Sequence, residues 1–220
     1  MGESTPRVPI LLGLYNRYLE HRDSAVYVER LSRSYRQGTL ERLAAHPGRE
    51  IRRAAVLALG FVGDYSANHT VGCALCDEDR PVRLLADTAI RSIWARAGND
   101  SQRRELAALV ELNAARRFDE VIQRAGVLIN KAQSYGEAWN QRAIAHFSLG
   151  HLEESIRDCH QTLEINPYHF AAAAGMGQAY LQLGNHACAL ECFRRALRLN
   201  SDLEAVRVQV ARLSRLLEGT

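Results

Sequence analysis

The sequence predicts an all-α protein built as a solenoid of stacked helix pairs. Two internal repeats lead to this prediction: residues 102–203 repeat every 34 residues, and residues 39–97 repeat with a spacing of about 31. Such periods are typical of helix-pair arrays, in which each unit buries its apolar face against its neighbours. The composition agrees, because 47% of the residues are hydrophobic, only five are proline, and no alternating strand pattern stands out.

The N-terminal part of the sequence is predicted to form six consecutive helices. Two amphipathic stretches, about 8–20 and 24–36, precede the shorter repeat and match no repeat well, so we expect them to cap it. The 31-residue repeat then predicts four helices, near 39–46, 50–62, 65–77 and 81–96. Gly98 ends the last of these, and Asp100 or Ser101 is expected to accept amide hydrogen bonds at the start of the next.

Residues 31 apart are chemically alike at six positions of this segment. The pairs are Ile51 and Val82, Arg52 and Arg83, Ala55 and Ala86, Ala58 and Ala89, Leu59 and Ile90, and Val62 and Ile93. With these residues the segment resembles HEAT repeats, especially the short bacterial form related to the phycobilisome-lyase type. The resemblance implies two stacked helix pairs, and it allows an accessory role beside a cofactor-attaching enzyme.

Residues 34 apart are alike in the second half of the chain. The offset aligns Leu109 with Ala143 and Gly177, Phe118 with Leu152, Ile122 with Ile156 and Leu190, Ile129 with Leu163 and Leu197, and Gly150 with Gly184. Together with Ala138-Trp139 and Asn166-Pro167, these residues resemble the tetratricopeptide (TPR) family. The resemblance implies a right-handed solenoid of antiparallel helix pairs with a concave binding face.

The two repeats divide the chain at residue 100. Residues 1–100 are expected to form an N-terminal cap with two HEAT-like repeats, and residues 101–220 to form three TPR units with a capping helix. The TPR units are predicted at 102–135, 136–169 and 170–203, and the capping helix at 203–217. The first unit matches least well, because Arg116 replaces the turn glycine and Gln133 replaces the proline.

The capping helix is expected to cover the last TPR unit with an apolar stripe. This stripe consists of Leu203, Val206, Val210, Leu213 and Leu217.

The concave face suggests a site for a protein partner. The first helix of each unit lines this face in the TPR family, so residues 34 apart should stand side by side across it. The expected columns are Leu106, Asn140 and Ala174; Val110, Ile144 and Gln178; and Asn113, Phe147 and Leu181. Apolar side chains interspersed with amides suit an extended peptide or an amphipathic helix. Alternatively, the chain's own packing covers part of this face, or the groove is empty.

A chaperone tail is not the expected ligand. Chaperone-binding TPR domains use a basic, asparagine-containing clamp for a terminal carboxylate. Here the corresponding positions hold Leu106, Val110, Ala171 and Gly175, and only Asn140 suits a clamp. We therefore predict that the chain does not bind chaperone C-terminal carboxylates.

Three soft metal ligands share one face of a predicted helix. His69, Cys73 and Cys76 stand at i, i+4 and i+7, a spacing that could bind a metal ion. The same spacing is the ordinary buried stripe of a repeat helix, and cysteine is a common core residue. We favour the buried stripe and expect neither a metal nor another cofactor.

Arg52 and Arg83 each follow an apolar residue at the start of a second helix. A phosphate site is one interpretation. In HEAT arrays, however, such arginines bond to acidic residues or carbonyl groups of the inter-helix loop, and Asp77 and Asp79 are close enough in sequence to serve Arg83. We favour this structural role.

Composition and charge narrow the function classes further. The chain has 27 arginines and one lysine, but residues 1–101 carry 14 basic against 12 acidic side chains and residues 102–220 carry 14 against 13. Because basic and acidic side chains are nearly balanced in both halves, the charge pattern does not indicate a surface for nucleic acid. Nucleic-acid binding through arginines is therefore only the third alternative. The apolar run at 9–14 is too short for a signal or a membrane span, and five cysteines without framework spacing favour the cytoplasm.

The sequence thus predicts a non-catalytic adaptor or scaffold. No glycine-rich phosphate loop or nucleophile–base arrangement indicates catalysis. The partner is expected to be a protein or peptide segment, without nucleic acid or membrane. The main alternative is an accessory subunit or chaperone of a cofactor-attaching, lyase-like enzyme.

Overall fold

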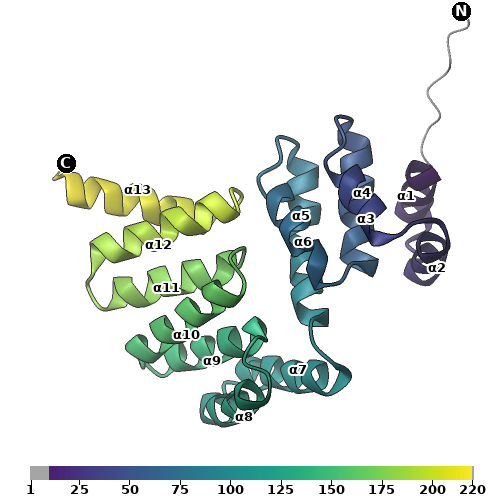
Figure 1. The fold of residues 1–220 in the computed structure, drawn as a ribbon. Helices are drawn as coiled ribbons and strands as arrows, with labels where there is room; N and C mark the ends of the chain where they lie inside the picture. Colours follow the sequence, from purple (N-terminus) through teal and green to yellow (C-terminus); the bar gives the residue numbers. More distant parts are fainter. Residues whose placement is uncertain (1–9, 220) are drawn as a thin grey trace, which may run out of the picture. The chain divides into compact units, whose positions relative to one another are not determined.

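Helices follow one another along the whole described chain, in two units (Figure 1). The computed structural model describes residues 10–219, and all regular secondary structure within them is helical, which confirms the predicted all-α class. By their contacts the units are Met1–Ile93 and Trp94–Thr220. Trp94 belongs to the second unit because its ring packs on His169 and Phe170 there.

The helices of the first unit lie within a few residues of their predicted positions; residues 8 and 9, where the first was expected to begin, lie outside the described residues. The elements are α1 (Ile10–His21), α2 (Ser24–Ser34), α3 (Gln37–Ala44), α4 (Arg49–Val62), the 3-10 helix η1 (Tyr65–Ala67), α5 (Asn68–Ala74) and α6 (Arg80–Arg96). The helix expected at 65–77 is shorter. It begins as a 3-10 turn, in which the Asp64 carboxylate accepts a 2.8 Å hydrogen bond from the Ser66 amide.

The second unit consists of three helix pairs and a final helix. The elements are α7 (Asp100–Ala114), α8 (Phe118–Lys131), α9 (Gly136–Ser148), α10 (Leu152–Ile165), α11 (Phe170–Gln182), α12 (His186–Leu199) and α13 (Glu204–Glu218). Each helix contacts the next along the chain, and α9 also contacts both α7 and α11. Every pair therefore packs mainly against its sequence neighbours.

The start of α7 differs from the prediction. Asn99, and neither Asp100 nor Ser101, is the capping residue: its side chain accepts the Gln102 amide at 3.0 Å, and the Gln102 side chain accepts the Asn99 amide at 2.8 Å. This reciprocal capping box satisfies two amides that the helix leaves unpaired.

Helix α13 covers the last helix pair with part of the predicted stripe. Val206 and Leu213 are buried, and Leu203 and Val210 pack partly against the same core. Leu217 was expected to join them, but it lies in the last turn of α13, outside this core, and is 49% exposed.

The three tight turns within the helix pairs share one backbone geometry. Arg116, Gly150 and Gly184 have φ values of 60°, 80° and 73°. In each turn the amide of this residue bonds to the carbonyl three residues back, and the following amide bonds to the carbonyl five residues back. Arg116 therefore adopts the left-handed conformation that the other two units assign to glycine.

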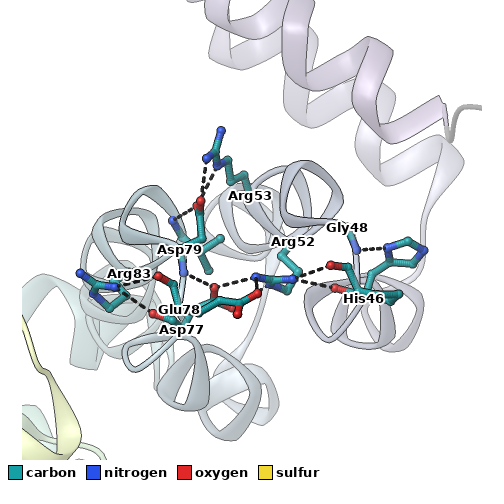
Figure 2. A network of polar contacts seen from close by, with 10 residues as sticks. His46, Gly48, Arg52, Arg53, Asp77, Glu78, Asp79 and Arg83 are labelled. Carbon is teal, nitrogen blue, oxygen red and sulfur yellow. Dashed lines mark hydrogen bonds and ion pairs between the residues drawn. The ribbon is translucent and has the colours of Figure 1, made fainter.

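A polar network connects the inter-helix loops of the first unit (Figure 2). The Arg52 guanidinium donates two hydrogen bonds to Asp77, at 2.8 and 2.9 Å, and one to Glu78 at 3.0 Å. Beside it, Arg53 donates two to Asp79, at 2.8 and 2.7 Å. The carboxylates of the loop before α6 thus bind arginines of α4, and Arg83, for which Asp77 and Asp79 were the expected partners, donates to the main-chain carbonyl of Asp77.

The 31-residue repeat reappears in the main-chain contacts of these arginines. Nη1 of Arg52 donates to the carbonyls of His46 and Pro47, six and five residues earlier. Nη1 of Arg83 donates to the carbonyls of Asp77 and Glu78, again six and five residues earlier. Both guanidinium groups therefore hold the loop that precedes their own helix, which is the structural role that the spacing favoured.

Replacement of Arg116 by glycine should stabilise the second unit. Glycine adopts positive φ without the Cβ clash, so we expect Arg116→Gly to raise the free energy of unfolding by about 0.5–1 kcal/mol. Denaturant unfolding followed by tryptophan fluorescence measures this, because Trp94 and Trp139 both lie in the second unit.

Gly150→Ala is the matched control. A Cβ at Gly150 would meet no atom within 4 Å. We therefore expect Gly150→Ala to lower the free energy of unfolding by a similar amount, and to do so through the backbone conformation alone. An Arg116→Gly variant that is no more stable than wild type, beside a destabilised Gly150→Ala, would show that the first turn is not strained.

Replacement of Asp79 by asparagine should remove part of the acid sensitivity of the first unit. The ion pair with Arg53 lowers the pKa of Asp79 from 3.8 to about 2, so its charge stabilises the fold above pH 4 and this contribution is lost as the pH falls through 2. Asparagine can still cap α6 at the Val82 amide, so the substitution removes mainly the charge. We expect Asp79→Asn to lower the free energy of unfolding by about 1 kcal/mol at pH 7 and to leave it unchanged near pH 1. Denaturant unfolding followed by circular dichroism measures this difference.

Asp87→Asn serves as the control for Asp79→Asn, because the Asp87–Arg91 pair is exposed and one helical turn apart. It should change the unfolding free energy by less than about 0.5 kcal/mol. A difference between wild type and Asp79→Asn that does not vary with pH would refute the electrostatic explanation.

Candidate peptide-binding surface

The nine residues predicted to bind a partner lie on α7, α9 and α11. These three helices are neighbours, since α9 contacts both of the others. Each is the first helix of its pair, as the repeat requires. The predicted residues are therefore on adjacent elements, but their side chains differ in accessibility.

Two apolar side chains of the set are open to solvent. Val110 on α7 is 47% exposed and Ile144 on α9 is 43% exposed. They occupy equivalent positions of adjacent units, because they are 34 residues apart. Phe147, in the next turn of α9, and Gln178 on α11 are half-buried. These side chains are the accessible part of the predicted surface.

Other members of the predicted set are buried or packed against the core. Leu106 is 5% exposed and belongs to the core that α7 and α8 form, so its expected role as a partner-binding residue is wrong. Ala174 and Leu181 pack partly against the core of the last two units. Asn140 is 8% exposed. The column of Leu106, Asn140 and Ala174 thus contributes little accessible surface.

An amide bridge joins α7 to α9 beside the two exposed anchors. Nδ2 of Asn113 donates to the main-chain oxygen of Gln141 at 3.0 Å and to its side-chain oxygen at 2.8 Å. Among residues 10–219, Oδ1 of Asn113 is buried without a hydrogen-bond partner. An orphan acceptor of this kind is costly unless a donor reaches it.

Gln141 was not among the predicted residues. The sequence does contain a signal for it, because Gln141 directly follows Asn140 on α9. Its pairing with Asn113, 28 residues earlier, departs from the 34-residue register and therefore escaped the column analysis.

The sequence analysis also did not predict a cluster of side chains around His169, just before α11. The His169 ring stacks on Trp94 at a centroid distance of 4.3 Å and lies 2.7 Å from a Glu137 carboxylate oxygen through Nε2. Nδ1 of His169 accepts the Ala172 amide, which leaves the proton on Nε2 to be donated to Glu137. With His169 only 1% exposed, this cluster anchors the helix and offers no accessible site.

Charges inside the central repeat are paired with one another. Arg142 donates two hydrogen bonds to Asp158, at 2.7 and 2.8 Å, and its guanidinium carbon lies 4.9 Å from the Trp139 ring centre. Burial lowers the pKa of the nearby His146. Because Asp158 is already bound by Arg142, this arrangement has a structural function.

His69 and Cys73 lie on the exposed face of α5, and Cys76, in the turn after this helix, is exposed as well. The expectation of a buried stripe is therefore wrong: the buried residues of this helix are Asn68, Val71, Gly72 and Ala74. The distance between Cys73 Sγ and His69 Nε2 is 4.0 Å. Within residues 10–219, no group of three or more histidine, cysteine or carboxylate side chains is arranged to hold a metal ion.

Comparison with known families identifies the central repeats. Residues 136–169 and residues 172–203 each match a tetratricopeptide repeat family. These are the second and third of the three predicted units. The chain also resembles a TPR repeat-containing protein of Rhizobium etli, with 33% identity over 85 residues, which are 39% of this chain and 42% of the relative.

More distant similarities extend to proteins of other kinds. Superkiller complex protein 3 of Mus musculus is 25% identical over 122 residues, 54% of this chain but 8% of that protein. A TPR2AB domain of yeast Sti1 in complex with HSP90 has a TM-score of 0.49 and 18% identity, over 93% of this chain and 90% of that one. The sequence matches thus span less than half the length of the Rhizobium etli and Mus musculus proteins, and the structural likeness to the Sti1 domain is too low to identify a ligand. Residues 136–169 and 172–203 of the chain thus resemble tetratricopeptide repeats.

Proposed function

We propose that the protein is a non-catalytic adaptor or scaffold that binds a peptide or helix on the α7–α9–α11 surface. The observation that supports this most is the exposed pair Val110 and Ile144 on adjacent repeats. Exposed apolar side chains on neighbouring helices suit a polypeptide ligand, whose own apolar side chains can pack against both. The TPR repeats agree with such a function.

The expected affinity comes mainly from the two anchors. Full burial of a valine or isoleucine side chain contributes roughly 1.5–3 kcal/mol, so the pair offers a few kcal/mol before the cost of association. Phe147 and Gln178, both half-buried, extend the surface on either side.

We infer that the first unit is HEAT-like and extends the scaffold. The matching carbonyl contacts of Arg52 and Arg83, 31 residues apart, support this assignment. In the alternative function, an accessory subunit of a cofactor-attaching enzyme, the protein would copurify with a bilin or a carrier protein.

The double substitution Val110→Glu/Ile144→Glu tests the adaptor function. After crosslinking and mass spectrometry have identified a partner in the native complex, the double variant should bind it 2–4 kcal/mol more weakly, because each charge would be desolvated where an apolar anchor was buried. Calorimetry measures the affinity. Melting should be unchanged, since both positions are exposed.

Two controls frame this test. Val127→Glu places the same charge on α8 at a valine that is 53% exposed and outside the surface, and should leave binding intact. Ala143→Glu should damage the fold, because Ala143 is 2% exposed in the core. Wild-type affinity in a normally folded double variant would move the partner site to another part of the molecule.

We further predict that the surface does not bind an acidic chaperone tail. The first TPR domain of Spaghetti is bound to the HSP90 peptide SRMEEVD, with a TM-score of 0.48, 19% identity, and coverage of 52% of this chain and 94% of that one. These comparisons give no support to the exclusion, which rests on the apolar or small residues at the clamp positions, Leu106, Val110, Ala171 and Gly175. Calorimetric titration with SRMEEVD should detect no binding, and binding that is lost in Asn140→Ala would contradict the prediction.

A further inference from the structure

A small cavity lies between α1 and α2 of the first unit, and none of the residues that line it belongs to the proposed peptide surface. Its volume is about 280 Å³. It is lined by Leu14, Arg17, Tyr18, His21, Asp23, Val26, Tyr27 and Arg30. The α1 residues stand at i, i+3, i+4 and i+7 and so share one face of that helix. The cavity is therefore a regular product of the α1–α2 pairing.

Aromatic side chains give this cavity a firm apolar wall. The rings of Tyr18 and Tyr27 lie 4.8 Å apart, and Phe61 of α4 contacts both edge-on, at 5.2 and 5.4 Å. Tyr27 is only 3% exposed. Leu14 and Val26 complete the apolar lining, so the interior suits an aromatic ring or a branched alkyl group.

Two arginines that line the cavity contact no acid of the described chain. Among residues 10–219, neither Arg17 nor Arg30 makes a hydrogen bond or an ion pair. Their neighbours are engaged: Arg33 pairs with Glu29 at 2.6 Å, and Arg22 lies over the Tyr18 ring at 6.0 Å. A planar guanidinium group without a partner is suited to a carboxylate.

The rim keeps a positive balance when its acid is included. The Asp23 carboxylate also lines the cavity, but it accepts the Val26 amide at 3.0 Å and so caps α2. Among the arginine and carboxylate groups that line the cavity, Arg17 and Arg30 carry two positive charges against the one negative charge of Asp23. The field at the mouth therefore favours an anion.

We propose that this cavity binds a small organic carboxylate whose body is an aromatic or branched apolar group. A cavity of about 150 Å³ takes up benzene, so 280 Å³ accommodates a ring with a short chain. The apolar body lies against Tyr18 and Tyr27, and the carboxylate lies between Arg17 and Arg30. Such a carboxylate comes from a free acid or from the C-terminal residue of a polypeptide.

The first arm of the test uses 4-phenylbutyrate and its neutral amide, each titrated into the full-length protein by calorimetry. The acid should bind in the millimolar range or tighter, and the amide at least fivefold more weakly. Arg17→Gln and Arg30→Gln should each weaken binding of the acid at least fivefold. Equal affinity for the acid and the amide would overturn the proposal.

Two further variants separate the cavity from general surface charge. Arg33→Gln removes an α2 arginine that does not line the cavity, and it should change the affinity by less than twofold. Val26→Glu fills the apolar wall with a negative charge at the third residue of α2, where glutamate favours the helix start. It should abolish binding with an unchanged melting curve, and retained binding would overturn the proposal.

The second arm distinguishes the two sources of the carboxylate. A hexapeptide ending in phenylalanine is compared as the free acid and as the C-terminal amide. If the peptide acid binds at least tenfold more tightly than 4-phenylbutyrate, and Arg17→Gln removes this gain, a polypeptide C-terminus is the ligand. If the peptide binds more weakly, the ligand is a free acid. A peptide amide that binds as tightly as the peptide acid would contradict both.

Discussion

Close packing of helices at positions without room for a side chain is the constraint on which the fold depends. A Cβ on Gly177 would lie 2.7 Å from the ring of Phe193, and a Cβ on Gly60 would lie 2.9 Å from the Cβ of Ala89. Both distances are shorter than any real carbon contact, so these pairs can form only with glycine. Each unit can then bury its apolar residues against the next helix.

Polar contacts between neighbouring helices and between loops reinforce this packing. In the central repeat, the Ser155 hydroxyl donates to the Ala143 carbonyl at 2.9 Å across the closely packed pair. In the first unit, Arg52 connects two loops, because its guanidinium holds the carbonyls of one and the carboxylate of Asp77 in the next. Buried charge is tolerated in these places because every donor has a partner.

The same logic separates structural arginines from those available to a ligand. Arg53, Arg124 and Arg142 each form a two-pronged contact with a carboxylate. These three arginines therefore each connect one helix to a neighbouring helix or loop. Arg17 and Arg30 differ because no acid of the described chain reaches them, although both border the same apolar cavity.

The accessible features of the two units have different chemistry. In the second unit, Val110 and Ile144 offer exposed apolar anchors on neighbouring helices. In the first unit, the cavity between α1 and α2 combines an aromatic wall with positive charge. No helix within residues 10–219 is long and apolar enough to cross a bilayer.

The positions of the helices, the tight turns and the loop arginines could be predicted from the sequence, because these depend on local spacing. The left-handed turns at Gly150 and Gly184 follow from glycine, and the equivalent roles of Arg52 and Arg83 follow from the 31-residue offset. Which helix faces are covered depends instead on contacts between helices that are distant in sequence. On α5, His69 and Cys73 have the same four-residue spacing as Asn68 and Gly72, yet only the second pair is buried. Periodicity fixes which residues share a face, whereas the neighbouring helices decide whether that face, or a residue such as Leu106, meets solvent.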